Sequence, residues 1–158
     1  MDWATIHLAT HHFPVVLSLV GAVAVPIGLA LRRQAAIHFG AVSVALAGAT
    51  APIAYLSGRL AAARVLGAEA GGALASELAA TLESHSTLGL AASAALLAAA
   101  AAAWAWLRVR PDRRVVVPLV ILSLLAAALT AAAGRAGGLI RHDGAVTDAP
   151  SGPNVRIR

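Results

Sequence analysis

Four long hydrophobic segments without a charged side chain limit most strongly what this chain can fold into. A helix that crosses the hydrocarbon core of a bilayer needs about 20 predominantly apolar residues. Four stretches of roughly this length contain no Asp, Glu, Lys or Arg: 13–31, 35–57, 87–107 and 115–133. The sequence therefore predicts an all-α membrane protein, built as a four-helix transmembrane bundle.

The composition favours a membrane protein over a soluble one. Of the 158 residues, 59% are hydrophobic and 12% are charged, whereas soluble domains have about 25% charged residues. The first hydrophobic segment does not resemble a cleavable signal peptide, because no Lys or Arg precedes it and Arg32 and Arg33 follow it directly. We therefore expect this segment to be retained as a transmembrane helix.

The distribution of arginine predicts the orientation of the bundle. Two short connections, 31–34 and 108–114, hold six of the twelve Arg and one acid, whereas the rest of the chain holds six Arg and six acids. By the positive-inside rule these connections are cytoplasmic, so we expect both termini and segment 58–86 on the outer side of the cell inner (plasma) membrane. The net charge of +5 then comes from arginines that set the orientation in a lipid bilayer. We expect no binding to nucleic acid.

The outer segment 58–86 is too polar to cross the bilayer but is rich in helix-forming residues. We expect a short helical segment between the second and third transmembrane helices. The composition of residues 147–158 predicts a flexible C-terminal tail, so the four-helix transmembrane domain is expected to span 1–146. No internal sequence repeat is evident.

Histidines stand at the outer ends of two predicted helices. His12 precedes the first hydrophobic segment by one residue, and His85 precedes the third by two. Two imidazoles at equal depth on different helices are what bis-histidine ligation of haem requires. The sequence therefore predicts a haem b electron-transfer protein in which His12 and His85 hold the haem iron near the outer face.

Two charged residues are predicted to support this site. Glu83 is expected to accept a hydrogen bond from the second nitrogen of a ligand histidine, and Arg135 to bind a haem propionate. Pairing of Arg135 with Glu83, with Asp143 or with lipid phosphate is the alternative.

Two other functions remain open. His7 and His11 lie four residues apart on one helix face, and with Glu83 or His142 they predict an outer copper or zinc site. A cofactor-free membrane scaffold or accessory subunit is the other alternative, with small-residue faces that bind another membrane protein or a redox partner. Because no hydrolase, metalloprotease or phosphate-loop motif is present, we expect an electron carrier or accessory subunit in preference to an enzyme.

The opening motif resembles that of a bacterial membrane family. The stretch "HLATHHFP" (7–14) is similar to the "HP, three residues, HFP" opening of the family called domain of unknown function 2231, although Leu8 replaces the proline. Three further stretches are similar to later elements of that family: "AYLSG" (54–58), "ESHSTLGLAA" (83–92) and "GRAGGLIRHDGAV" (134–146). In the last of these, Arg141 and His142 replace the usual aromatic residue. The resemblance implies a four-helix membrane domain.

Overall fold

The computed structural model describes the backbone of residues 3–68, 73–108 and 112–143, and the side chains of these residues except 65–68, 73–78, 113 and 139–143. Within these ranges the protein is entirely helical apart from short turns, and no strand is present. The helices are α1 (Trp3–Thr10), α2 (His12–Ala30), α3 (Gln34–Ala68), α4 (Ala73–Arg108) and α5 (Arg113–Asp143).

Four helical segments are long and apolar enough to cross a membrane, which confirms the predicted all-helical membrane-like bundle. The first, Trp3–Ala30, combines α1 and α2. The other three lie within α3, α4 and α5: Gln34–Arg64, Ala79–Arg108 and Arg114–Gly138.

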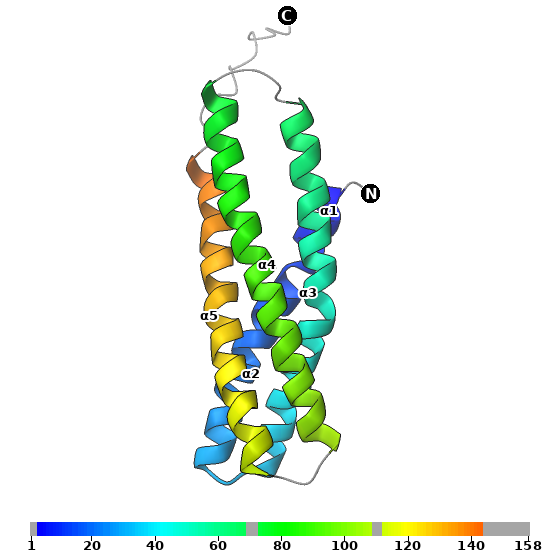
Figure 1. Ribbon diagram of the computed structural model, residues 1–158, viewed down its shortest axis with the longest axis vertical. Helices are drawn as coiled ribbons and strands as arrows, with labels where there is room; N and C mark the ends of the chain where they lie inside the picture. Colours follow the sequence, from blue (N-terminus) through cyan, green and yellow to red (C-terminus); the bar gives the residue numbers. More distant parts are fainter. Residues whose placement is uncertain (1–2, 69–72, 109–111, 144–158) are drawn as a thin grey trace, which may run out of the picture.

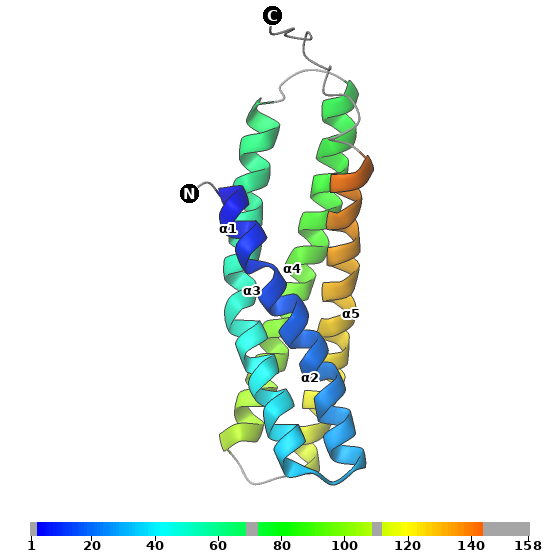
Figure 2. The same cartoon turned by 180° about the vertical axis from the view of Figure 1, so that it is seen from behind.

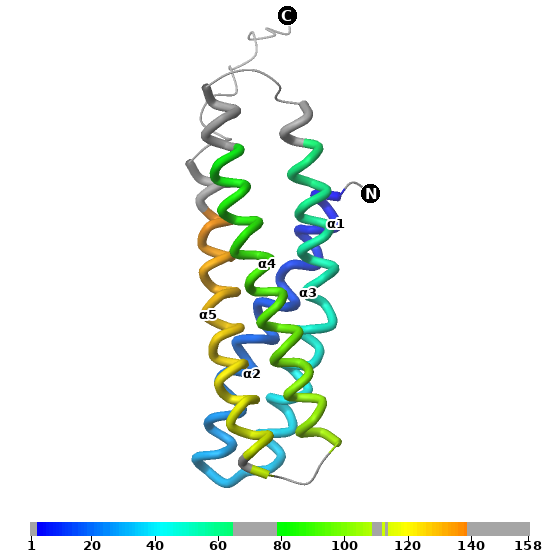
Figure 3. Tube along the Cα trace, in the orientation of Figure 1, coloured from blue at the N-terminus to red at the C-terminus, as the bar shows by residue number. Residues whose placement is uncertain are grey.

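The helices form an elongated antiparallel bundle in which α1 and α2 run obliquely across the other three (Figure 1, Figure 2). The Cα trace shows the same course, with α1 beside α3 at one level and α2 reaching the lower end of α5 (Figure 3). A bend separates α1 from α2 because Pro14 has no N–H for the carbonyl of Thr10, four residues earlier. The α2–α3 turn and the facing ends of α4 and α5, at Arg108 and Arg113, lie at one end of the bundle (Figure 1).

The outer segment differs from the short separate helix that the sequence predicted. Helix α3 continues to Ala68, and α4 already begins at Ala73. The segment is therefore mostly an extension of two membrane helices, because its helix-forming residues let the backbone hydrogen bonding continue. Gly71, Gly72 and the predicted tail 147–158 lie outside the described residues.

Small residues allow the helices to pack closely. Buried alanines of α3 and α4, such as Ala47 and Ala99, share one core cluster with the larger side chains of Val25, Leu96 and Leu119. Large apolar side chains such as Leu46 and Leu97 are exposed on the outside of the bundle, where a bilayer would contact them. Van der Waals packing between small residues is the main source of helix association in lipid.

A tight turn joins α2 to α3. The N–H of Arg33 donates to the carbonyl of Gly28 (2.7 Å), and the N–H of Arg32 donates to that of Leu29 (3.2 Å). Arg32 has a positive φ of 52°. This is a Schellman C-cap, which reverses the chain within a few residues and sets α2 and α3 antiparallel.

Gly48→Ala is expected to destabilise the bundle by about 1–3 kcal/mol, because overpacking a close interface forces backbone shifts. A Cβ at position 48 would lie 2.7 Å from the carbonyl oxygen of Leu96 on α4, which is a backbone atom that cannot rotate away. Gly134→Ala is the matched control, since a Cβ there meets nothing within 4 Å. Thermal unfolding in detergent should show a lower midpoint for Gly48→Ala only, and equal midpoints for the two variants would contradict this packing.

Candidate functional site

His7 connects α1 to α3 through its imidazole. Its Nδ1 lies 2.8 Å from the carbonyl oxygen of Ala54, and since a carbonyl can only accept, Nδ1 carries the hydrogen and donates it. The ring lies directly against Gly58, where a Cβ would come within 2.9 Å of Cε1 of His7. Glycine at position 58 therefore provides the space that this ring occupies.

His85 makes the same arrangement between α4 and α5. Its Nδ1 donates to the carbonyl oxygen of Ala133 at 3.0 Å. The ring lies against Gly137, where a Cβ would come within 2.9 Å of Cε1 of His85. We call the set His7, Ala54 and Gly58 the first histidine clasp, and the set His85, Ala133 and Gly137 the second histidine clasp.

The two clasps are a repeat that the sequence analysis missed. The histidine and the alanine are 47 residues apart in the first clasp and 48 apart in the second, and in both the glycine follows the alanine by four positions. Few other residues match between the two halves, so the similarity was not visible as a conventional repeat. A search for histidine followed 47 or 48 residues later by Ala-x-x-x-Gly would have found it.

The second nitrogen of each clasped ring is free in the described part of the chain. When a neutral imidazole donates through Nδ1, its lone pair is on Nε2, and no hydrogen bond involves Nε2 of His7 or of His85 among the described residues. His7 lies on α1, and His85 lies in the first half of α4, which ends at Arg108.

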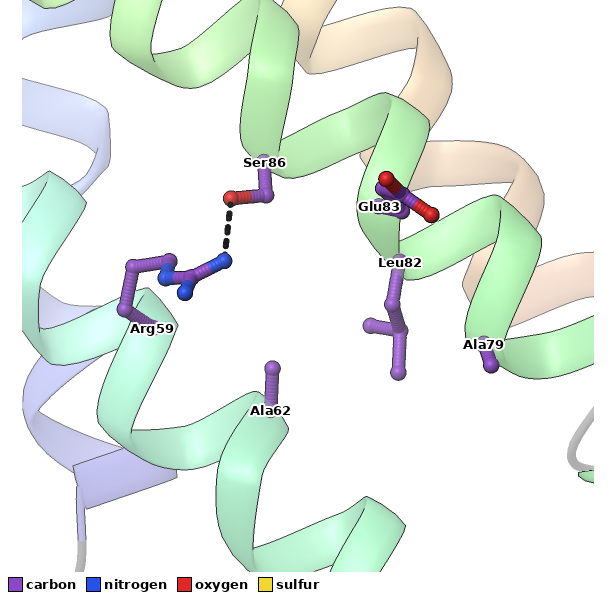
Figure 4. Close-up of a pocket in the computed structure, with 6 residues that line it drawn as sticks. All are labelled: Arg59, Ala62, Ala79, Leu82, Glu83 and Ser86. Carbon is purple, nitrogen blue, oxygen red and sulfur yellow. Dashed lines mark hydrogen bonds between the residues drawn. The ribbon is translucent and has the colours of Figure 1, made fainter.

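A polar contact bridges α3 and α4 next to both clasps. Nη1 of Arg59 donates to Oγ of Ser86 at 3.1 Å. Arg59 directly follows Gly58, and Ser86 directly follows His85. These residues line a cavity of about 260 Å³, which Figure 4 shows in close-up, together with Ala62, Ala79, Leu82 and Glu83.

His7 and His85 each bond to a carbonyl of a neighbouring helix, whereas His12 makes no such bond among the described residues. His12 is exposed on α2, its ring centroid lies 3.8 Å from that of His11, and no interaction between His12 and His85 occurs among the described residues. Glu83 is exposed on the wall of the cavity. Arg135 is exposed on α5 and forms no ion pair within the described ranges.

The residues of the predicted copper or zinc site are only partly described. The rings of His7 and His11 stack with their centroids 5.2 Å apart, and Nδ1 of His11 donates to the carbonyl of His7 on its own helix at 3.0 Å. The side chain of His142 lies outside the described residues. Among the residues that are described, no group of three or more His, Asp or Glu side chains is arranged to hold a metal ion.

His38 is the remaining histidine of the described chain, and it stands apart from the clasps. It is exposed near the start of α3, and its Nδ1 donates to the carbonyl of Gln34 on its own helix at 3.1 Å. Its ring centroid lies 6.3 Å from that of Trp106. It therefore serves as a control position for experiments on His7 and His85.

Comparisons of the chain with protein-family models, with curated proteins and with solved structures gave no match. The resemblance of the opening motif to a known membrane family therefore stays a prediction.

Gly58→Ala should displace the ring of His7, and Gly137→Ala that of His85, because each new Cβ would occupy the space of the imidazole. We expect ¹⁵N NMR of histidine-labelled protein in detergent to show the Nδ1–H tautomer for both rings. Each glycine variant should change the signals of its own histidine only and cost about 1 kcal/mol for the lost hydrogen bond. Gly138→Ala is the control, since the space around it is open; unchanged histidine signals in all three variants would contradict the clasps.

Proposed function

We propose that this chain is an integral membrane protein that holds haem b between His7 and His85 and transfers single electrons. The observation that carries the proposal is the pair of clasped imidazoles, each held through Nδ1 by a neighbouring helix and each with an unbonded Nε2 atom. Bis-histidine haem needs one such nitrogen on each side of the ring. The proposal keeps His85 from the sequence prediction and replaces His12 by His7.

The donor set of the described residues suits this cofactor. Imidazole nitrogens from two different helices can approach a planar ring from opposite sides, whereas a structural zinc site uses four ligands and a catalytic one three. Gly58 and Gly137 provide the space that each imidazole occupies. When bound, haem b supplies a reversible one-electron change at its iron.

The clasps give each histidine the properties of a good ligand. Donation of Nδ1–H to the carbonyl of Ala54 or Ala133 fixes the tautomer and the ring orientation. Such a hydrogen bond also raises the basicity of the ligating nitrogen. In this proposal Ala54 and Ala133 act as positioning residues through their backbone, and His7 and His85 alone touch the iron.

We further propose that the clasps lie near the outer face of the plasma membrane, with both termini outside. Support comes from the arginine-bearing α2–α3 connection and the facing ends of α4 and α5, which share the opposite end of the bundle (Figure 1). The positive-inside rule assigns such connections to the cytoplasm.

A cofactor-free scaffold or accessory subunit is the second candidate function. It is favoured by the exposed face of α5, where a Cβ at Gly134 or Gly138 would meet nothing within 4 Å. Glycines four residues apart on a lipid-facing surface allow close approach of another helix. In that case the histidine clasps would only fasten helices together, and the partner would be another membrane protein.

Absorption spectra test the haem proposal. Protein produced with ample haem and purified in detergent should show a reduced-minus-oxidised α-band, because two imidazoles make the iron low-spin. His7→Ala and His85→Ala should each remove the band, whereas His12→Ala and His38→Ala should retain it. Absence of the band from the wild-type protein would overturn the proposal, and its loss in His12→Ala but not in His7→Ala would restore the pair predicted from sequence.

Cysteine labelling tests the orientation, and the absence of native cysteine makes it direct. Ser151→Cys, in the C-terminal tail, should react with a membrane-impermeant maleimide on intact spheroplasts. Gln34→Cys, at the exposed first residue of α3, should react only after the membrane is disrupted. The reverse pattern would place the clasps at the cytoplasmic face.

A further inference from the structure

We propose that Arg59, positioned by Ser86, binds a carboxylate of the ligand that the two clasps hold, which for haem b is a propionate. This inference rests on the proposed function. It assigns to Arg59 the role that the sequence analysis predicted for Arg135.

The position of Arg59 is fixed by both clasps. The first clasp holds the α3 backbone at Gly58, one residue before Arg59, and the second holds α4 at His85, one residue before Ser86. The hydrogen bond from Nη1 of Arg59 to Oγ of Ser86 spans the two helices at 3.1 Å. In this proposal the guanidinium lies beside the ligand that His7 and His85 share.

The guanidinium of Arg59 has more hydrogen-bond donors than its contact with Ser86 uses. A guanidinium carries five N–H groups in a planar fork that matches a carboxylate. Only Nη1 has a side-chain partner, and no ion pair joins Arg59 to an acid among the described residues. Charge-assisted, two-point hydrogen bonding to a carboxylate is the strongest use of the remaining donors.

The adjoining cavity fits a short carboxylate arm. Its volume is about 260 Å³, and Ala62, Ala79 and Leu82 form apolar walls that would accept methylene groups. Arg59 and Ser86 supply polar groups on one side, as Figure 4 shows. A carboxylate on two methylenes, as in a propionate, has this combination of apolar stem and charged end.

Among the residues whose side chains are described, Glu83 is the one acid that lines the cavity. It lies one helical turn before Ser86 on α4, and its negative charge opposes a bound carboxylate. The proposal therefore predicts opposite effects for the two charged residues: loss of Arg59 weakens carboxylate binding, and loss of the Glu83 charge strengthens it.

The test compares haem b with its dimethyl ester, in which both propionates are neutral. Each is titrated into full-length protein in detergent, for the wild type and for Arg59→Gln. We expect the wild type to bind haem b about tenfold more tightly than the ester, as a lost charge-assisted hydrogen bond implies, and Arg59→Gln to bind both alike. Arg64→Gln is the matched control, since Arg64 is also exposed on α3 but does not line the cavity; it should keep the preference, and Glu83→Gln should increase it.

The outcomes separate the two proposals. If the wild type binds haem b and the ester equally, or if Arg59→Gln weakens both equally, Arg59 has only a structural or lipid-binding role and this inference fails while the haem proposal stands. If Arg135→Gln removes the preference and Arg59→Gln does not, Arg135 is the carboxylate partner and the inference also fails. If the wild type binds neither compound, the haem proposal fails and the inference fails with it.

Discussion

Hydrogen bonding without water is the constraint on which this structure depends. In the hydrocarbon core no solvent can pair with a backbone N–H or C=O group, so a spanning segment must be helical. The same constraint acts on side chains: the buried hydroxyls of Ser123 and Thr130 donate to carbonyls of their own helix, at 2.6 Å and 2.7 Å. His7 and His85 also bond to carbonyls, but on a neighbouring helix. In each clasp a single hydrogen bond therefore both pairs a polar side chain and joins two helices.

The clasps also explain how a helix bundle of small residues can present chemically useful groups. Alanine and glycine let the helices approach closely, and at Gly58 and Gly137 the missing side chain is replaced by an imidazole from the adjacent helix. The ring is held by its Nδ1, so its Nε2 keeps a lone pair in a defined direction. The Arg59–Ser86 bond holds a cation between α3 and α4, at the residues that follow Gly58 and His85. The proposed ligand site thus arises from the same glycine and imidazole contacts that pack the helices together.

Several features were predictable because they depend on local composition. Segment length and hydrophobicity gave four spans, and the structure contains four helices of the required kind. His85 was selected because it precedes the third hydrophobic segment by two residues, and its role as a ligand stays a prediction. The proposed partner of His85 was different, because depth along the membrane says nothing about rotation around a helix axis. His7 faces α3, whereas His12, after the bend caused by Pro14, is exposed.

The sequence by itself determined that the chain forms apolar helices and that its arginines gather in two connections, because both follow from residue type and spacing alone. Only the tertiary structure decided which histidine faces which glycine, because contacts such as those of His7 with Ala54 and of His85 with Ala133 join residues 47 and 48 positions apart. Such contacts depend on how the helices cross and rotate against one another. A rotation of 100 degrees per residue can move a side chain from a helix interface to lipid without any change in hydrophobicity.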